Sequence, residues 1–292
     1  IWRGSGIIHH TMSDTIQQLQ PSEFPPLLRE IADPPERLYI RGALPPTEYK
    51  CLCVVGSRKA TAYGRDVCNE LISGLSGYPI VIVSGLALGT DAAAHETALD
   101  AGLSVLAVPG SGLSEDVLYP RTNLGLARRI LESGGALLSE FPPDYRARPE
   151  SFPQRNRIMA GLSHAVLVIE AEVRSGTLIT ARLATEYNRD VLTVPGSIFS
   201  SHSSGPHMLM RLGAVPVRGK EDILEALGIE TKQQETSATP QGFSAEEGVV
   251  WEILKTPVPR DVLMTQLNLS AHKANVLLGA MELKGLIVER MG

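Results

Sequence analysis

The chain has 292 residues, of which 43% are hydrophobic and 20% are charged, and its formal net charge at pH 7 is −5. This length and composition describe a soluble globular protein with room for one large domain or two to three smaller ones. The acidic balance argues against a protein that is basic over its whole surface, so any nucleic-acid contact must come from a local patch.

The cysteines and the apolar runs indicate a reducing, aqueous compartment. Cys51, Cys53 and Cys68 lack a Cys-x-x-Cys pair and a clustered histidine, which predicts reduced, structural thiols and no metal site. No run of about 18 apolar residues predicts a membrane span, and the amino terminus lacks the pattern of a secretory signal. We therefore expect a cytoplasmic protein that makes no membrane contact.

The amino-terminal fifty residues are predicted to contribute little to the core. Residues 1–11 precede a Met-Ser-Asp sequence and are interpreted as upstream sequence outside the fold. Residues 12–50 carry only short apolar groups between prolines at positions 21, 25, 26, 34, 35, 45 and 46. Proline fixes φ and removes a backbone donor, so this composition predicts an extended, proline-rich arm that packs against the main body.

From residue 51 to residue 229, short apolar runs are each followed by a glycine-rich turn and a helical stretch. The runs cover residues 51–55, 80–84, 104–109, 136–141, 164–170 and 190–195, and the helical stretches include 62–75, 91–101, 122–132, 178–188 and 220–227. Continuous β-branched runs are typical of strands buried on both faces of a parallel sheet, and the helices have the length of right-handed crossovers. The body is therefore predicted to be a doubly wound α/β domain with a mostly parallel sheet.

The composition changes again after the body. Residues 230–242 lack large apolar side chains, which predicts a linker. Three helical segments follow, at about 244–255, 259–267 and 270–284, and then a short strand at 286–290, which together predict a small C-terminal winged-helix domain over residues 243–292. This segment has five basic and six acidic residues, so we interpret it as a protein contact rather than as a reader of duplex DNA.

The glycines of the body concentrate in the turns that follow its strands. Ligands of an open parallel sheet bind outside the carboxyl ends of the strands, where small residues and free N–H groups favour an anion. One such turn has an ordinary explanation, since glycine is often needed only for a positive φ. Five on one edge favour an extended anion as the ligand. They are Gly56–Lys59, Ser84–Asp91, Pro109–Leu113, Arg174–Thr177 and Pro195–Ser197.

Arginine dominates the cations of the body, with fourteen arginines and three lysines between residues 50 and 230. A guanidinium fork matches phosphate oxygens and stacks on aromatic faces. The segment Phe152–Ile158 sets Arg155 and Arg157 two residues apart after a proline-rich loop, which predicts a phosphate grip with Phe152 or Tyr145 as a stacking face. An ordinary solvated helix start, and a core position for Phe152, are the alternatives. Further cations near this edge are Arg58, Arg146, Arg148 and Arg174.

The signatures of nucleotide enzymes are absent from these turns. Gly56–Thr61 is neither a Gly-x-Gly-x-x-Gly fingerprint nor a phosphate loop, so the motifs that would best indicate binding of NAD or ATP are missing from this turn. Gly110–Gly112 lacks the flanks of a nucleophile elbow. His95 follows Asp91 by four residues on one helix face, and we interpret it as stabilising its own turn rather than as a base. No catalytic set and no cofactor are predicted.

In this order, the turns resemble those of the DNA-processing protein A family (DprA, also called Smf) over about residues 24–228. The resemblance implies an extended Rossmann domain that binds single-stranded DNA, forms a homodimer and helps to load RecA onto DNA taken up in natural transformation, without catalysis. The matching segments are Val55–Arg58, Ser84–His95, Pro109–Leu113, Tyr119–Pro120, Ser139–Pro142, Phe152–Ile158 and Arg174–Thr180.

By position, the resemblance assigns the DNA backbone to Arg58 and the Arg155–Arg157 loop, and the pocket walls to the other turns. The chain departs from the family pattern just before Phe152, where a lysine is replaced by Pro149–Ser151 and where Arg146 and Arg148 are the substitutes. Glu172 and the Gly205–His207 segment are further departures. The implied DNA-binding residues are Gly56, Ser57, Arg58, Ser84, Gly85, Gly89, Asp91, Gly110, Gly112, Arg146, Arg148, Phe152, Arg155, Asn156, Arg157, Arg174, Ser175, Gly176 and Thr177.

Two other functional classes stay open on the sequence. A nucleotide phosphoribohydrolase is the alternative, because Pro109–Gly112 and Ser175–Thr177 echo parts of its Pro-Gly-Gly-x-Gly-Thr-x-x-Glu loop, although no segment has the whole pattern. A protein-interaction scaffold is the third class. Release of ribose 5-phosphate would indicate the enzyme, and binding of single-stranded DNA would indicate the recombination mediator. A scaffold would show neither.

Overall fold

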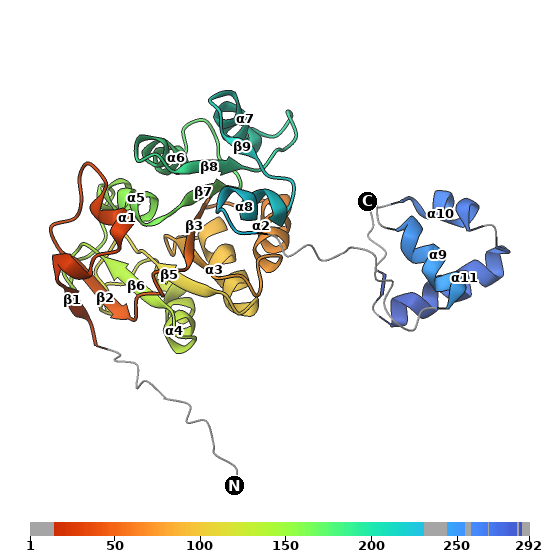
Figure 1. Cartoon of the computed structure of the whole chain (residues 1–292), viewed down its shortest axis with the longest axis horizontal. Helices are drawn as coiled ribbons and strands as arrows, with labels where there is room; N and C mark the ends of the chain where they lie inside the picture. Colours follow the sequence, from red (N-terminus) through yellow and green to blue (C-terminus); the bar gives the residue numbers. More distant parts are fainter. Residues whose placement is uncertain (1–14, 231–243, 255–257, 268, 285, 288–292) are drawn as a thin grey trace, which may run out of the picture. The chain divides into compact units, whose positions relative to one another are not determined.

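The computed structural model describes residues 15–230, 244–254, 258–267, 269–284 and 286–287. These residues fall into two compact units, one on each side of the predicted linker. In Figure 1 the first unit runs in colour from red to cyan and the second is blue. Most of the predicted linker, residues 231–242, lies outside the described residues, and each unit is described by itself.

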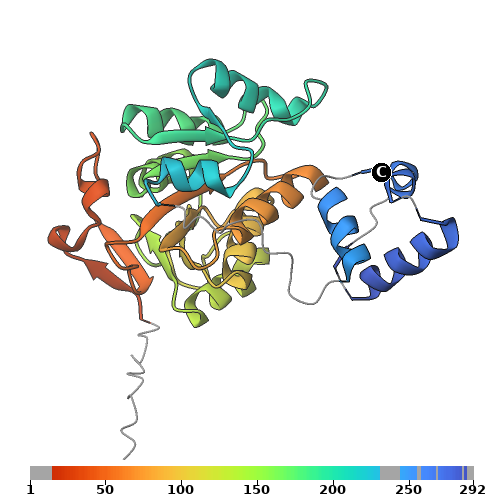
Figure 2. The same cartoon turned by 45° about the vertical axis from the view of Figure 1, so that its right-hand side comes forward.

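A nine-stranded sheet forms the centre of the first unit (Figures 1 and 2). The strand order is β1-β2-β6-β5-β4-β3-β7-β8-β9. Strand β2 pairs antiparallel with β1 and β6, and all other pairs are parallel. This confirms the predicted α/β class and the mostly parallel sheet. From β1 to β9 the strands span Gln17–Leu19, Leu38–Gly42, Lys50–Val55, Ile80–Ser84, Ser104–Ala107, Ala136–Ser139, Ala165–Val168, Asp190–Thr193 and Val215–Pro216.

Helices cover both faces of this sheet because successive strand residues point to opposite sides. Leu52 and Val54 of β3 join a core with α2, α3, α4 and α8, whereas Cys53 and Val55 join a second core with α1, α5, α6 and α7. Both faces are therefore buried, as the apolar runs predicted. From α1 to α8 the helices span Pro26–Arg29, Ala62–Ser73, Thr90–Asp100, Leu124–Glu132, Ser151–Leu162, Thr177–Glu186, Ser204–Arg211 and Lys220–Ala226, with 3-10 turns at Pro21–Glu23, Arg121–Asn123 and Ser201–Ser203.

The proline-rich segment is more structured than the prediction of an extended arm. Strand β2 joins the main sheet beside β6, with Tyr39 opposite Ser139, and β1 pairs with β2 at the edge of the sheet. Helix α1 packs on α5, where a Cβ on Gly161 would lie 2.9 Å from a methyl carbon of Leu28. The first domain therefore begins before residue 51. The prolines stand at the starts of these short elements or in the loops between them, where their missing N–H costs no ladder bond.

Helix α5 corrects the assignment of Arg155–Arg157 to a loop and contains the whole Phe152–Ile158 segment. The segment lies inside a helix of 12 residues, Ser151–Leu162, with Pro153 in its first turn, a position that tolerates proline because its N–H has no partner within the helix. Residues two positions apart on a helix point about 200° apart. Arg155 and Arg157 therefore cannot face one phosphate from the same side of α5.

The described residues of the second unit form three helices around a small core of their own. Helices α9, α10 and α11 span Ala245–Ile253, Arg260–Gln266 and Ala271–Leu283, close to the predicted segments. The Lys284 ammonium, after α11, lies 2.6 Å from the Glu247 carboxylate of α9. The predicted strand 286–290 is not formed at the described Leu286 and Ile287, and residues 288–290 lie outside the described residues. The winged-helix assignment therefore stays a prediction.

Candidate nucleic-acid interface

The parallel strands bring their following turns to one edge of the sheet, called here the carboxyl edge. Hydrogen bonds join these turns side by side. The backbone N–H of Thr90 donates to the carbonyl of Ser57 at 3.1 Å, which attaches the β4–α3 turn to the β3–α2 turn. The hydroxyl of Thr177 donates to the carbonyl of Gly56 at 3.0 Å, which attaches the β7–α6 turn from the other side. The carboxyl edge is therefore one continuous, braced surface.

Two glycines make this close approach of the turns possible. A Cβ on Gly56 would lie 2.4 Å from the Thr90 hydroxyl oxygen, and a Cβ on Gly89 would lie 2.3 Å from the carbonyl oxygen of Ser57. Gly89 also has a φ of +76°, which L side chains rarely adopt. These two predicted site residues therefore shape the surface through their backbone.

Arg155 lies beneath the carboxyl edge rather than on it. Its side chain is on the buried side of α5, and the residue is only 4% exposed. Its Nη1 donates to the carbonyl of Gly85 at 2.7 Å and also to the carbonyl of Val108. Arg155 thereby ties the end of β4 to the end of β5. The prediction that it grips phosphate is corrected, because the structure assigns this guanidinium a positioning role.

Asp91 and His95 of α3 belong to the same buried layer as Arg155. The Asp91 carboxylate accepts hydrogen bonds from the N–H groups of Gly85 at 3.0 Å and Ala87 at 3.4 Å, and so shapes the turn from inside. Burial raises the pKa of Asp91, an effect that Arg155 and the two donors oppose. Burial lowers the pKa of His95 to about 3, so the ring is neutral at physiological pH. Asp91 thus stabilises the turn after β4 from beneath and does not itself face a ligand.

Arg157 is also held by protein groups. Its guanidinium pairs with the Glu140 carboxylate, which follows β6, and donates to the carbonyl of Asp33. Its side chain is 13% exposed and that of Glu140 is 9% exposed. The predicted phosphate contact of Arg157 is therefore corrected to an ion pair that fastens α5 to β6 and to the amino-terminal segment.

A cation and two aromatic rings form the exposed centre of the carboxyl edge. The guanidinium carbon of Arg58 lies 5.0 Å from the ring centre of Phe152, a cation–π distance. The ring of Tyr119 lies 5.6 Å from that of Phe152 at an interplanar angle of 52°, and Tyr119 is 46% exposed. We call Arg58, Phe152 and Tyr119 the Arg58 cluster. It combines a phosphate donor with aromatic faces at the solvent boundary.

The segment before α5 adds exposed cations beside this cluster. Arg148 lies 5.8 Å from the ring centre of Tyr145, which stacks on Phe141 at 4.5 Å. The N–H of Gly112 donates to the carbonyl of Tyr145 at 2.8 Å, so the segment is attached to the turn after β5. Arg146 and Arg148 are both exposed. The structure thus leaves the two proposed substitutes for the missing lysine accessible to a ligand.

The turn after β7 contributes one more exposed cation. Arg174 is exposed at its tip, and the Ser175 hydroxyl lies 3.0 Å from the Thr177 hydroxyl. Asn156 of α5 is 8% exposed and donates to the carbonyl of Gly176 at 3.4 Å, so it braces this turn.

The predicted site residues therefore divide into two groups. Those at the solvent boundary, exposed or partly exposed, are Arg58, Arg146, Arg148, Phe152, Arg174, Gly176, Gly56, Ser57, Gly89 and Ser175, and the buried framework comprises Ser84, Gly85, Asp91, Gly110, Gly112, Arg155, Asn156 and Thr177. Arg157 lies between the two groups, held in its ion pair.

The predicted set lacks some exposed residues of this edge, Tyr119 and Lys59 among them. Tyr119 belongs to the Tyr119–Pro120 pair that contributed to the family resemblance, yet no role was assigned to it. Lys59 follows Arg58 and is exposed. A stronger weight on any aromatic or cationic residue within a strand-following turn would have found both, because such residues are costly to bury there.

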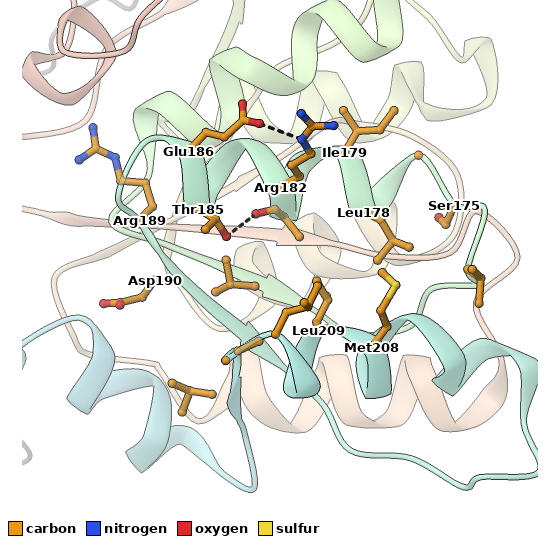
Figure 3. Close-up of a pocket in the computed structure, with 18 of the residues that line it drawn as sticks. Ser175, Leu178, Ile179, Arg182, Thr185, Glu186, Arg189, Asp190, Met208 and Leu209 are labelled. Atoms are coloured by element: carbon orange, nitrogen blue, oxygen red, sulfur yellow. Dashed lines mark hydrogen bonds and ion pairs between the residues drawn. The ribbon is translucent and has the colours of Figure 1, made fainter.

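A groove with a volume of about 960 Å³ lies between α6, α7 and the strands β8 and β9, and it shares the turn Arg174–Gly176 with the carboxyl edge (Figure 3). Its wall combines apolar side chains such as Leu178, Ile179 and Leu209 with the Arg182–Glu186 ion pair on α6. Leu212 and Val215, which also line it, are 76% and 45% exposed. This is a largely apolar surface, unlike the carboxyl edge.

Fold and site together define a doubly wound α/β protein with a cation–aromatic surface at the carboxyl edge of its sheet. Sequence comparison identifies the family. The profile of the family described as DNA recombination-mediator protein A matches residues 15–228, and the chain belongs to this family. Among the described residues, no helix is both long and apolar enough to cross a membrane.

Individual relatives agree with this assignment. The chain is 44% identical over 207 residues to Protein Smf of Escherichia coli, a match that covers 70% of this chain and 55% of that protein. The X-ray structure of DNA processing protein A (DprA) from Streptococcus pneumoniae is 40% identical, with a TM-score of 0.67 over 72% of this chain and 74% of that one. DNA processing protein A from Helicobacter pylori, whose structure describes a single-stranded DNA binding mode, is 28% identical, with a TM-score of 0.64 over 74% and 96% of the two chains.

Proposed function

We propose that the chain binds single-stranded DNA at the carboxyl edge and acts as a non-catalytic recombination mediator. The observation that carries the proposal is the Arg58 cluster, in which an exposed guanidinium lies 5.0 Å from an aromatic ring centre. Single strands present both a charged backbone and unstacked bases, and proteins bind them through cations and aromatic platforms together. The exposed Arg146, Arg148 and Arg174 supply further phosphate contacts along the same edge.

A single strand fits this surface better than a duplex does. Duplex readers insert a helix or a ribbon into a groove and contact the edges of paired bases. The Arg58 cluster instead offers ring faces, and paired bases in a duplex already stack on their neighbours. The single-stranded DNA binding mode described for the H. pylori relative supports the proposal for this chain.

Loading of RecA onto the bound strand, during natural transformation, is the finer part of the proposal. Membership in the recombination-mediator family supports it. Strand-exchange assays with and without the chain test this role separately from DNA binding itself.

We infer a homodimer in the cytoplasm, with the groove of Figure 3 as its contact face. Ile179, Leu212 and Val215 leave apolar surface exposed around this groove, and β9 is the last strand of the sheet. A largely apolar face next to the last strand of a sheet suits a twofold interface. We further propose that the second unit is a winged-helix module that contacts protein rather than duplex DNA.

The phosphoribohydrolase alternative has less support from the geometry. Its partial motifs follow β5 and β7, and two strands, β4 and β3, separate these in the sheet. The one histidine of the buried layer, His95, has a pKa lowered to about 3 by burial, which suits a base at neutral pH poorly. Release of ribose 5-phosphate from a nucleoside monophosphate would restore this alternative.

Fluorescence anisotropy of a labelled oligothymidylate tests the proposed site. We expect Arg58→Ala to weaken binding by at least tenfold, because it removes both a phosphate donor and the cation above Phe152. Arg129→Ala is the matched control, since Arg129 is 51% exposed and pairs with Asp100 where α3 and α4 end, at the opposite edge of the sheet. Equal affinities of the two variants would reject the site.

A further inference from the structure

A second aromatic surface lies at the carboxyl edge, beside the end of β8. Phe199 is 94% exposed and Ile198 is 79% exposed, whereas Phe24 and Phe141 of the same unit are buried. The loop that carries them is formed by hydrogen bonds: the N–H of Phe199 donates to the Ser197 hydroxyl at 3.2 Å, and that of Ser200 donates to the Ser197 carbonyl at 3.1 Å. The ring is therefore presented to solvent by a folded turn.

Tyr63 joins this loop to the start of α2. Its hydroxyl donates to the carbonyl of Pro195 at 2.7 Å, and a Cβ on Gly196 would lie 4.0 Å from its ring. Tyr63 is nevertheless 50% exposed. The bond fixes the ring while one side stays accessible, which reduces the entropy cost when a flat ligand stacks on it.

The new surface is continuous with the Arg58 cluster. Tyr63 lies five residues after Arg58, and the exposed Lys59 stands between them. The intervening Thr61 is anchored, because its N–H and its hydroxyl both donate to the Glu170 carboxylate, at 3.0 and 2.6 Å. The β3–α2 turn therefore connects the two aromatic surfaces through a rigid, basic link.

The charges around this surface suit an anionic ligand. The N–H of Ala171 donates to the carbonyl of His202 at 2.9 Å, and this bond places the turn of the exposed Arg174 beside the loop. No carboxylate occurs between residues 195 and 205, and the neighbouring turn carries two, the exposed Glu172 and the buried Glu170, which accepts hydrogen bonds from Thr61. Cations thus flank the aromatic side chains through Lys59 on one side and Arg174 on the other.

The geometry points to a second base-stacking subsite for single-stranded nucleic acid, formed by Tyr63 and Phe199, onto which a strand bound at the Arg58 cluster continues. This inference rests on the proposed function. Phe152 lies against Gly110 after β5, and Phe199 follows β8, four strand spacings away in the sheet. Four spacings are about 19 Å, which a stacked strand with a rise of about 3.4 Å covers in about six nucleotides. Only a strand longer than this span reaches both subsites.

Competition between oligothymidylates of different length tests the subsite in the full chain. Unlabelled dT4 and dT20 displace a labelled dT20 from the parent protein and from Phe199→Ala, Phe199→Trp and Leu283→Ala. The last variant is a matched control, because Leu283 is 92% exposed in the second unit. We expect Phe199→Ala to weaken dT20 about 5- to 30-fold, the effect of losing one stacked base, and to leave dT4 unchanged. Phe199→Trp, which retains an aromatic face, keeps the parent affinity.

Photocrosslinking supplies a second readout that does not depend on affinity. A 20-mer with 5-iododeoxyuridine is expected to crosslink to Tyr63 or Phe199 as well as near Phe152. Equal dT20 affinity of Phe199→Ala and the parent, with no adduct at either ring, overturns the subsite while the proposed function stands. Loss of dimer mass in Phe199→Ala, measured by light scattering with unchanged dT20 affinity, also overturns it by showing a protein interface. A parent protein that binds neither oligonucleotide contradicts the proposed function itself.

Discussion

Arginine performs two different tasks within a few residues of this chain. Arg155 and Arg157 have their guanidinium groups bound to carbonyl and carboxylate oxygens of the protein, while Arg58 keeps its own at the surface over Phe152. A buried guanidinium has five donors with which to fix several backbone segments at once. Arg155 and Arg157, whose spacing suggests a phosphate grip, therefore hold the framework beneath the carboxyl edge, and Arg58 lies on its exposed surface.

Substitution of Arg155 distinguishes support from contact. Arg155→Ala leaves the carbonyls of Gly85 and Val108 without their donor and the buried Asp91 without its countercharge, so we expect a loss of about 3 kcal/mol in the free energy of unfolding. Arg58→Ala is expected to leave stability nearly unchanged, because the side chain is exposed. Urea denaturation followed by circular dichroism measures both. An Arg155→Ala variant with parental stability but no DNA binding would mean that this residue touches the ligand.

His95 predicts a specific acid sensitivity. Its pKa is about 3 in the folded protein and 6.5 as the ordinary value, so the unfolded chain binds more protons between these values. The stabilisation is therefore complete above about pH 6.5 and is lost as the pH falls toward about 3. Between about pH 7 and about pH 5.5, the expected loss is about 1 kcal/mol. In urea titrations, the free energy of unfolding of His95→Gln should therefore fall by about 1 kcal/mol less than that of the parent over this pH interval. An identical decline in the parent and the variant would contradict the assignment of this acid sensitivity to His95.

At the scale of elements, the apolar runs predicted all six central strands and the fold class. The reason is physical, since strands buried on both faces have no other way to satisfy their apolar side chains. The failures are equally informative. Strand β2 was missed because Leu38–Gly42 is short and follows prolines, and its place is set by pairing with β6 across about a hundred residues. Long-range pairing of this kind leaves no periodic signal in the sequence.

For the candidate site too, the sequence predicted some features, and others depend on the tertiary fold. The strand-following turns were predictable, because a parallel sheet must gather them at one edge. The orientation of Arg155 and Arg157 was not predictable, because it depends on the start of α5 at Ser151. Exposure separates the arginine that we propose as a DNA contact from the buried structural ones, and exposure is a property of the tertiary fold.

The turn after β5 is an element whose shape sets the Arg58 cluster. A Cβ on Gly110 would lie 2.7 Å from a ring carbon of Phe152, so Gly110→Ala must displace that ring. We expect DNA affinity to fall severalfold while the fold persists, since a ring can rotate away. Gly125→Ala is the matched control, because a Cβ there meets nothing within 4 Å. Parental affinity in Gly110→Ala would show that the position of Phe152 is unimportant.

At the scale of the whole molecule, two surfaces of the first unit have different characters and different proposed partners. The carboxyl edge is cationic and aromatic, and the groove between α6 and α7 is largely apolar. The match to E. coli Smf spans about half the length of that relative, so activities of the complete relatives are proposals for this chain.

The apolar groove gives the prediction for assembly. Leu212→Asp places a charge on a side chain that is 76% exposed in the single chain, so the folded monomer should tolerate it. The dimer should not tolerate the substitution, because its contact face would bury an unpaired charge, which is costly. Multi-angle light scattering is expected to show a dimer for the parent and a monomer for the variant. A parent that is monomeric at all concentrations would contradict the inferred interface.

The salt dependence of single-strand binding tests the central claim most directly. For a single strand, each phosphate that a cation neutralises adds about 0.7 to the slope of log affinity against log salt. The account predicts that dT20 binds more tightly than a duplex of equal length and that its affinity falls as salt rises. Replacement of Arg58, Arg146 and Arg148 by alanine should make the slope of log affinity against log salt shallower by about 2. An unchanged slope in this triple variant, or a parent that prefers duplex, would contradict it.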